Sequence, residues 1–296
     1  MRILLTILVF IFAPVLTEQG LQIGEININN QKIKIMKMNL NNPAFLQMAG
    51  NAGISECVVL RYSTQDQSAI VSCLGDLTVS SIKNGIAHEE HFSNLNNFAI
   101  TFNSDENRDI ILYGRITSLS GGNGPYRFEE LNYISVKNAK SLTSLDCSRS
   151  QISSLDVSKN TALTSLSCSG TQISSLDVSK NTALTSLICS STQISSLDVT
   201  QNTALTSLNC SSTQISSLDV SKNTALTSLN CSSVPNITNI SAHLRTSVIA
   251  NNVAAAIQSA ISEDGTLEVY GQYGYNATAT NVATEKGWTV EYVDAA

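Results

Sequence analysis

The sequence predicts a β-rich solenoid with parallel strands stacked on two sides, a β-rich N-terminal segment and an α/β C-terminal cap. A 21-residue unit recurs with few changes, as in LTSLSCSGTQISSLDVSKNTA at residues 163–183. Within each unit, apolar residues alternate with Ser and Asp over two short runs, which is the period-two pattern of strands. The chain on either side, at 20–115 and 241–296, has different patterns.

The composition indicates a folded chain. The 296 residues are 42% hydrophobic and 14% charged, and the formal net charge is −6. A chain with this apolar content can bury a core. Nucleic-acid binding would require a basic stripe, and the sequence has none, so no nucleic-acid partner is expected.

The first residues have the form of a secretory signal peptide. Arg2 lies within the stretch MRILLTILVFIFAPVL, and the polar TEQG follows it. The apolar run is shorter than the roughly 20 residues that a membrane-spanning helix needs. We therefore expect residues 1–19 to be a signal peptide, with a membrane anchor as the alternative. The rest of the chain is expected to be secreted or at the cell surface, with no later transmembrane segment.

Each repeat has two halves, L-x-x-L-x-C and I-x-x-L-x-V-x-x-N, and the repeats begin at Leu142, Leu163, Leu184, Leu205 and Leu226. As strands, the halves would place Leu166, Cys168, Leu176 and Val178 inward and the residues between them outward. One coil cannot be stable alone, because each apolar slot contributes about 1.5–3 kcal/mol and each ordered residue costs about 1–2 kcal/mol. Stacked coils share their core, so residues 116–240 are expected to form one solenoid.

The repeat resembles the leucine-rich repeat. Its doubled form with LDVSKNTAL resembles the short nested, internalin-like repeats of exported and surface proteins from Bacteroides-like bacteria. The resemblance covers about 131–240. It implies a right-handed coil, and it implies protein binding rather than catalysis.

Two columns of residues are expected inside the coil. The resemblance implies an asparagine ladder that hydrogen-bonds the backbone at the turns, at Asn160, Asn181, Asn202 and Asn223. Five cysteines recur every 21 residues, and Cys often behaves as a small buried hydrophobe, so we interpret them as buried thiols: Cys147, Cys168, Cys189, Cys210 and Cys231. Cys57 and Cys73 lie outside the repeat, and whether they pair with each other is left open.

The flanking segments also have readable patterns. Period-two runs at 23–29, 32–38, 57–62, 98–102 and 109–114 predict N-terminal strands, and DIILYGRITSLS is a candidate for the start of the stack. At the other end, VAAAIQSAI predicts a helix, GTLEVYG a strand, and ATNVATEKGWTVEYV a helix that stops at Gly287 before a final strand. Solenoids need closed ends, so this segment is expected to be a cap with Trp288 in its core.

Three sets of residues are candidates for binding. The first is an outward carboxylate column, Asp156, Asp177, Asp198 and Asp219, with neighbours about 4.8 Å apart. These charges need compensation, either from flanking Ser and from Lys159, Lys180 and Lys222, or from a bound Ca²⁺. The second is an outward slot that varies between repeats, in which Ile188 is expected to be an exposed apolar residue: Asp146, Ser167, Ile188, Asn209 and Asn230. The third is the loop with Tyr273 and Tyr275, which either contacts a protein or sugar or packs the cap.

The sequence gives little support for catalysis. His88 and His91 are three residues apart without an evident third ligand, and a polar helix or loop is expected there. No Ser-His-Asp set, phosphate loop or CxxC motif occurs, so we expect no enzyme activity, metal site or cofactor. The leading hypothesis is an exported adhesion protein that binds an extracellular protein or polysaccharide. The alternative is a structural spacer or surface-coat module, which the near-identical copies favour.

Overall fold

The computed structural model contains two compact units, residues 1–53 and 54–296. In the first unit, β1 (Gln22–Ile28) and β2 (Gln31–Lys37) form an antiparallel pair. The expected signal peptide lies outside the described residues. Those residues are 22–28, 31–37, 56–62, 67–83, 86–96, 98–102, 109–121, 128–271 and 276–293.

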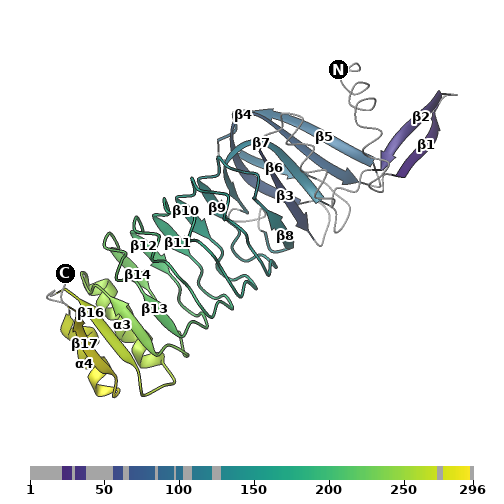
Figure 1. Cartoon of the computed structure of the whole chain (residues 1–296). Coiled ribbons are helices and arrows are strands. Elements are labelled where there is room, and N and C mark those ends of the chain that lie inside the picture. Colours follow the sequence, from purple (N-terminus) through teal and green to yellow (C-terminus); the bar gives the residue numbers. More distant parts are fainter. Residues whose placement is uncertain are drawn as a thin grey trace. The chain divides into compact units, whose positions relative to one another are not determined.

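The second unit begins with antiparallel strands, shown in Figure 1. They are β3 (Cys57–Tyr62), β4 (Gln67–Lys83), β5 (Ile86–Ser93), β6 (Phe98–Phe102), β7 (Asp109–Ser120) and β8 (Leu131–Ser135). β4 pairs with β5, β6 and β7, and β3 pairs with β7 and β8. The expectation of a helix or loop around His88 and His91 is wrong, because both lie on β5, which pairs with β4 over its whole length.

Strand β7 joins this antiparallel part to the repeats. Its first half pairs antiparallel with β3, from Cys57↔Tyr113 to Arg61↔Asp109. Its last residues pair in parallel with β9 (Ser144–Asp146), with Leu119 opposite Leu145. The segment DIILYGRITSLS therefore supplies the strand on which the first repeat stacks.

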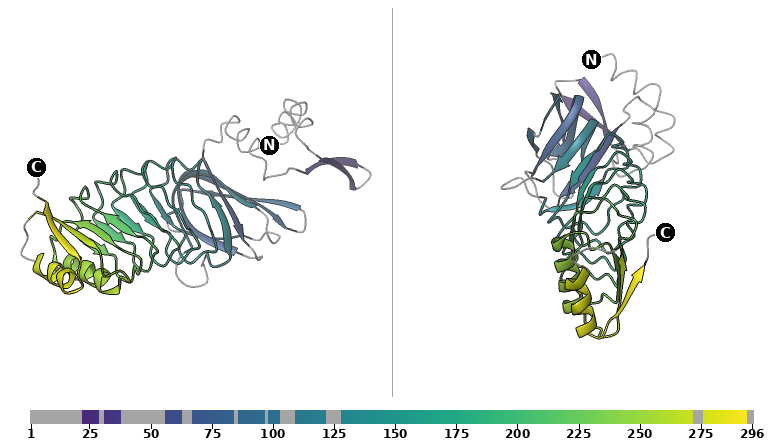
Figure 2. Two further views of the ribbon diagram at one scale, coloured as in Figure 1. Left: turned by 60° about the horizontal axis from the view of Figure 1, so that its bottom comes forward. Right: turned by 90° about the vertical axis from the view of Figure 1, so that its left-hand side faces the viewer.

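The first halves of the repeats form a regular parallel sheet, which runs along the stacked coils in Figure 2. After β9 come β10 (Ser165–Ser167), β11 (Ser186–Ile188), β12 (Ser207–Asn209) and β14 (Ser228–Asn230). The central leucines lie opposite one another and are buried: Leu145, Leu166, Leu187, Leu208 and Leu229. The inward positions that the alternation predicts are therefore the ones that form the core.

The second side of the coils differs from the prediction of a strand in every repeat. Among the repeats, only β13 (Ser217–Asp219) is a strand there, and it pairs with β15 (Asn239–Ala242). In the earlier coils the backbone link on this side is a hydrogen bond such as that from Gln172 N to Ile152 O, at 3.0 Å. A strand ladder needs a series of matched N–H and C=O groups, so the first-half sheet is the better formed of the two.

The C-terminal segment has the predicted order of helix, strand, helix and strand. The elements are α3 (Ser247–Ser259), β16 (Thr266–Tyr270), α4 (Asn276–Glu285) and β17 (Thr289–Val293). α3 begins earlier than the expected helix because Thr246 Oγ1 accepts a hydrogen bond from Ile249 N, at 3.2 Å, as an N-cap. α3 contacts both β14 and α4.

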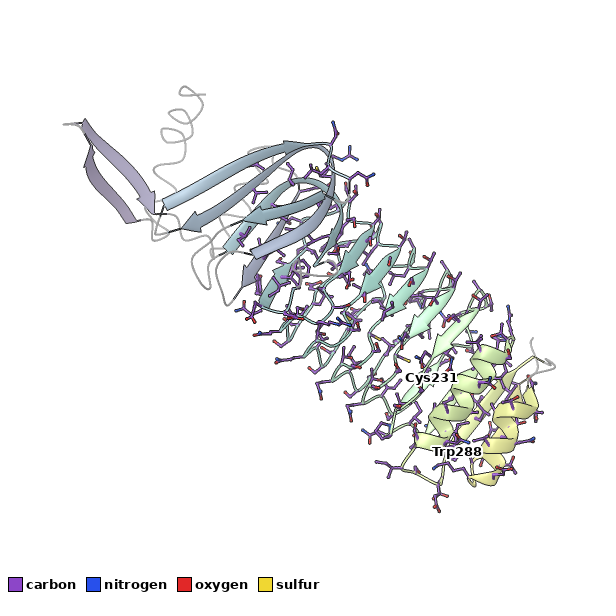
Figure 3. All side chains as sticks on the ribbon, turned by 180° about the vertical axis from the view of Figure 1, so that it is seen from behind. Cys231 and Trp288 are labelled. Carbon is purple, nitrogen blue, oxygen red and sulfur yellow. The ribbon has the colours of Figure 1, made fainter. Side chains whose placement is uncertain are left out.

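Trp288 is buried within this segment, as expected, and is labelled in Figure 3. Its indole N–H donates to Ser262 O at 3.2 Å, which satisfies the polar atom of the ring. A Cβ atom placed on Gly265 would lie 2.2 Å from Cε2 of Trp288. Only glycine therefore allows the backbone to pass so close to the ring.

Candidate functional site

The outer face of the first sheet carries the slot that varies between repeats, here called the variable column. Strand pairing brings its members into one row, Asp146, Ser167, Ile188, Asn209 and Asn230. Ile188 is half-buried, not exposed as the sequence suggested. The reason is geometric: Ser167 and Asn209 lie directly opposite it on the neighbouring strands, at about the strand spacing of 4.8 Å.

Asn209 and Asn230 also support the turns that follow their strands. Oδ1 of Asn209 accepts hydrogen bonds from Ser211 N at 3.1 Å and from Ser211 Oγ at 2.8 Å. Oδ1 of Asn230 accepts equivalent bonds from Ser232 at 3.2 Å and 2.8 Å. Both amide oxygens therefore accept hydrogen bonds in local Asx-turns. Ile188 is the member of the column whose side chain has no polar atom.

The carboxylates of the second side follow the same local pattern. Each accepts a hydrogen bond from the backbone N–H two residues later, at 2.8–3.0 Å: Asp156 from Ser158, Asp177 from Ser179, Asp198 from Thr200 and Asp219 from Ser221. Side-chain hydroxyls of Ser158 and Thr200 add bonds of 2.7 Å to Asp156 and Asp198. This geometry makes each Asp the cap of its own turn.

In Asp156, Asp177 and Asp198 these hydrogen bonds favour the ionised carboxylate and lower its pKa. The pKa of Asp156 falls to about 2, mainly through the bond from the Ser158 hydroxyl and then through Lys137. Nζ of Lys137 lies 3.0 Å from Oδ2 of Asp156, so the ion pair comes from the preceding coil. The pKa values of Asp177 and Asp198 are lowered by the backbone N–H groups of Ser179 and Thr200, while the neighbouring Asp in each case opposes the shift.

The five repeat cysteines form one buried column, and all have 0% of their surface exposed. The backbone N–H of Cys147 donates to Ser167 O, and that of Cys168 donates to Ile188 O, so each rung is tied to the next coil. Burial raises the pKa of the thiol in every rung, to about 12 for Cys168 and Cys231. The thiols are therefore protonated and sealed from solvent.

Cys57 and Cys73 are not joined to each other by a disulfide in the structure, although both are buried. Nδ2 of Asn138, which comes from the first turn of the solenoid, lies 3.7 Å from Sγ of Cys57. Burial raises the pKa of the Cys57 thiol. The pairing that the sequence left open is thus not formed, and Cys57 packs instead where the N-terminal strands meet the first turn.

The asparagine ladder lies inside the turns of the second half. Nδ2 of Asn181 donates to Val157 O at 3.0 Å and to Asn160 O at 2.8 Å. The other members make the same two bonds to the preceding coil, and all are buried: Asn160, Asn202 and Asn223. Each of these carbonyl oxygens also accepts a backbone N–H within its own turn, as Val157 O does from Asn160 N, so the ladder adds a second donor from the next coil.

A threonine ladder was missed by the sequence reasoning. Thr164 Oγ1 donates to Thr143 O at 3.0 Å, and the backbone N–H groups of Thr164 and Ser165 donate to the same oxygen. The pattern continues through Thr185, Thr206 and Thr227, and it begins at Thr117 O, which accepts from Thr143. Exposed threonines resemble ordinary surface residues in a sequence, and only their strict 21-residue recurrence could have indicated a structural role.

The remaining expectations concern metals, membranes and the tyrosine loop. Within the described ranges, no group of three or more His, Cys, Asp or Glu residues is arranged to hold a metal ion. No helix in the described part of the chain has both the length and the apolar character to cross a membrane. Tyr273 and Tyr275 lie outside the described residues.

Comparisons with known proteins were made by sequence and by structure. No family model matches the chain, and no curated protein matches it. Solved structures that match include the functional domain of InlJ from Listeria monocytogenes, which includes a cysteine ladder, at 25% identity and a TM-score of 0.38. An internalin, InlF, from the same species matches at 18% identity and a TM-score of 0.36, and the leucine-rich repeat domain of APL1B at 18% and 0.31.

These likenesses are partial in both directions. The InlJ and InlF matches each cover 61% of this chain, and the APL1B match covers 53%. The chain spans 39% of the InlJ structure, 56% of the InlF structure and 52% of the APL1B structure. What this chain is similar to is therefore a set of internalin and leucine-rich repeat structures.

Proposed function

We propose that this chain is a secreted or cell-surface leucine-rich repeat protein that binds an extracellular protein and carries out no catalysis. The binding surface is the outer face of the sheet from β9 to β14. Residues 1–19 act as the signal peptide, and the C-terminal segment acts as the cap of the solenoid. These assignments rest on the residue patterns and on the geometry of the sheet.

The variable column is the observation that carries the proposal. It is flanked on the same face by two columns that hold Ser in every repeat, one led by Ser144 and the other by Ser148. Between these uniform columns the residues change from Asp through Ser and Ile to Asn, with Ile188 at the centre. The surface of a protein partner is not periodic, so a face that binds one is expected to differ from repeat to repeat. An apolar side chain at the centre of that face can be buried by the partner.

A protein is favoured over a polysaccharide on this face. The sequence contains no aromatic residue between Tyr133 and Tyr270, so the sheet lacks rings on which sugars could stack. If a polysaccharide is bound, the tyrosines near the C-terminal end are the candidates for that contact. The loop with Tyr273 and Tyr275 therefore remains a separate prediction.

A second candidate function is a structural spacer without a specific ligand, because many outward polar side chains hydrogen-bond within their own turns. Asn209, Asn230 and the four Asp residues of the second side direct their side-chain oxygens into their own turns. Side-chain oxygens that already accept hydrogen bonds within the protein are less able to accept hydrogen bonds from a binding partner. The binding protein and the spacer thus differ in one respect: only in the binding protein does a partner cover Ile188 and the residues around it.

Binding of the full chain to an immobilised panel of extracellular-matrix proteins and polysaccharides separates the two. One variant makes the last four positions of the column uniform with Ser167 through Ile188→Ser, Asn209→Ser and Asn230→Ser. A matched control alters the other side through Asp156→Asn, Asp177→Asn, Asp198→Asn and Asp219→Asn. Loss of binding in the first variant alone supports the proposal. Equal binding by wild type and the first variant contradicts it, and failure of the wild type to bind any panel member favours the spacer.

The carboxylate column is proposed to hold turns and not Ca²⁺. Each carboxylate already accepts one or two hydrogen bonds within its own turn, and Asp156 also has the Lys137 ion pair. Thermal unfolding in millimolar Ca²⁺ and in EDTA should give the same Tm. A rise in Tm with Ca²⁺ that EDTA reverses, and that Asp177→Asn with Asp198→Asn abolishes, would instead establish a calcium site.

A further inference from the structure

The last rung of the cysteine column is covered by a helix and not by another coil. Sγ of Cys231 donates a hydrogen bond to the carbonyl oxygen of Asn252, in the middle of α3, at 3.6 Å. Nδ2 of the same Asn252 donates to Leu229 O on β14 at 2.6 Å. Figure 3 labels Cys231 at this end of the sheet, beside α3. One residue of α3 thus contacts both the last strand and the last thiol.

Cys231 and the rung before it are positioned as neighbours. Cys210 N donates to Asn230 O at 2.9 Å, directly after the paired residues Asn209 and Asn230. Residues opposite each other on adjacent parallel strands are about 4.8 Å apart. This separation falls within the range of roughly 4.4–6.8 Å between the Cα atoms of a disulfide. The Cα separation is therefore compatible with a disulfide between the two cysteines, which the folded protein does not contain.

We propose that Cys210 and Cys231 are a latent disulfide pair, and that helix α3 is the lid that keeps them reduced. While α3 is docked, both thiols have no exposed surface and no oxidant reaches them. When α3 separates from β14, Cys231 becomes the first rung to meet solvent. The pair then oxidises and joins the last two coils covalently. This inference does not depend on the proposed binding function.

The oxidant is a disulfide, such as oxidised glutathione, in the surroundings of the protein. The thiolate of Cys231 attacks one sulfur of the oxidant, which forms a mixed disulfide and releases one thiolate. The thiolate of Cys210 then attacks Sγ of Cys231, the mixed disulfide breaks, and a second thiolate leaves. Two protein thiols are oxidised and one external disulfide is reduced, and the two protons that the cysteines lose are taken up by the two leaving thiolates, which become thiols.

The C-terminal end is the expected site of opening. A terminal coil has a repeat neighbour on one side only, so it opens at lower free energy than the coils inside the stack. α3 has no acidic residue in its first turn and no basic residue in its last, so its dipole receives no support from charged side chains. At the opposite end, Cys147 follows β9, which is continuous with β7 in one sheet. The column is therefore closed by a sheet at one end and by a helix at the other.

The test uses the full chain, oxidised glutathione, and mass spectrometry of peptides after alkylation. Asn252→Ala removes the side-chain bond to Leu229 and should speed formation of the Cys210–Cys231 disulfide roughly 3- to 10-fold. Gln258→Ala is the matched control, because Gln258 is exposed on the same helix. Cys147 and Cys168 should stay reduced in all three proteins. Equal rates in wild type and Asn252→Ala, or simultaneous oxidation of all five rungs, would overturn the proposal.

A second measurement covers the outcome in which Asn252→Ala does not fold. Wild-type protein is alkylated in urea concentrations below its unfolding transition, and each cysteine is followed separately. The lid predicts that Cys231 reacts before Cys168 as urea rises. If both react only in the global transition, α3 does not act as a lid.

Discussion

The side-chain amide of Asn202 donates a hydrogen bond to the carbonyl oxygen of Asn181, one coil earlier, at 2.9 Å. The same amide also donates to Val178 O at 3.0 Å, and Asn202 is fully buried. Both oxygens also accept a backbone N–H in their own turn, so the single side chain of Asn202 adds a second hydrogen bond to each and links the two coils. The stack is held by polar bonds in its interior as well as by apolar packing.

Substitution of that asparagine should be strongly destabilising. Asn202→Ala removes one of the two hydrogen bonds that each of these carbonyl oxygens accepts, and each such bond contributes about 0.5–1.5 kcal/mol net. We expect the free energy of unfolding in urea to fall by about 1–3 kcal/mol. The adjacent Gln201 is exposed, so Gln201→Ala should change it by less than about 0.5 kcal/mol. A small effect of Asn202→Ala would show that the ladder is not a main source of stability.

A second prediction concerns the left-handed residue that follows each repeat cysteine by two positions. The φ angle is 67° at Gly170 and 55° at both Ser191 and Ser212. Non-glycine residues are strained there by about 1–2 kcal/mol, so Ser191→Gly should raise the free energy of unfolding by up to about 1 kcal/mol. Gly170→Ala should lower it by about 1 kcal/mol, although a new Cβ atom would meet only ordinary contacts of 3.7 Å or more.

Ser175→Gly is the matched control for this prediction. Ser175 is exposed and is not among the residues with positive φ, so glycine there adds only backbone entropy to the unfolded chain. Its effect should have the opposite sign to that of Ser191→Gly. The same sign in both variants would contradict the role of backbone strain.

A third prediction links Asp156 to acid unfolding. Its pKa in the folded protein is about 2, below the value of 3.8 for an ordinary Asp. A lowered pKa stabilises the fold above about pH 4, and this contribution is lost as the pH falls from about 4 to 2. Because the carboxylate is 46% exposed and screened by solvent, the contribution should be only about 0.5–1 kcal/mol.

The pH dependence of this contribution can be measured by urea unfolding of wild type and Asp156→Asn at several pH values. The two stabilities should differ at pH 7 and converge near pH 2. A difference that stays constant over this range would mean that the ionised carboxylate does not act through its lowered pKa.

The regular interior of the solenoid could be predicted from the sequence because the position of a residue within the repeat determines whether its side chain points inward. The alternation around Leu166 and Cys168 places both residues inward, and both are buried. The resemblance to leucine-rich repeats implied a buried ladder at positions such as Asn181, and the structure contains that ladder. The role of each of these residues follows from its place in the repeat, and the repeat occurs several times in the sequence.

Features that depend on the neighbouring coil could not be predicted in the same way. The stretch around Leu176 has the alternation of a strand, but a strand forms only where a neighbour offers a full ladder, as β15 does for β13. Ile188 was expected to be exposed, and its cover comes from Ser167 and Asn209 on other strands. The role of Asn252 over Cys231 joins residues from different patterns, and no repeat relates them.

The most direct test of the whole account is to remove one coil. Deletion of residues 184–204 takes out one 21-residue repeat and joins Ala183 to Leu205, so every ladder regains an equivalent partner. Deletion of 184–194 joins Ala183 to Ser195, and it places Ser195, Asp198 and Thr200 in the inward slots of Leu184, Leu187 and Cys189. Circular dichroism with urea unfolding should show a folded protein with one cooperative transition for the first deletion and loss of the fold for the second. If both deletions fold equally well, or if the 21-residue deletion fails to fold, the coils are not held in register by the coil before them, and the account is wrong.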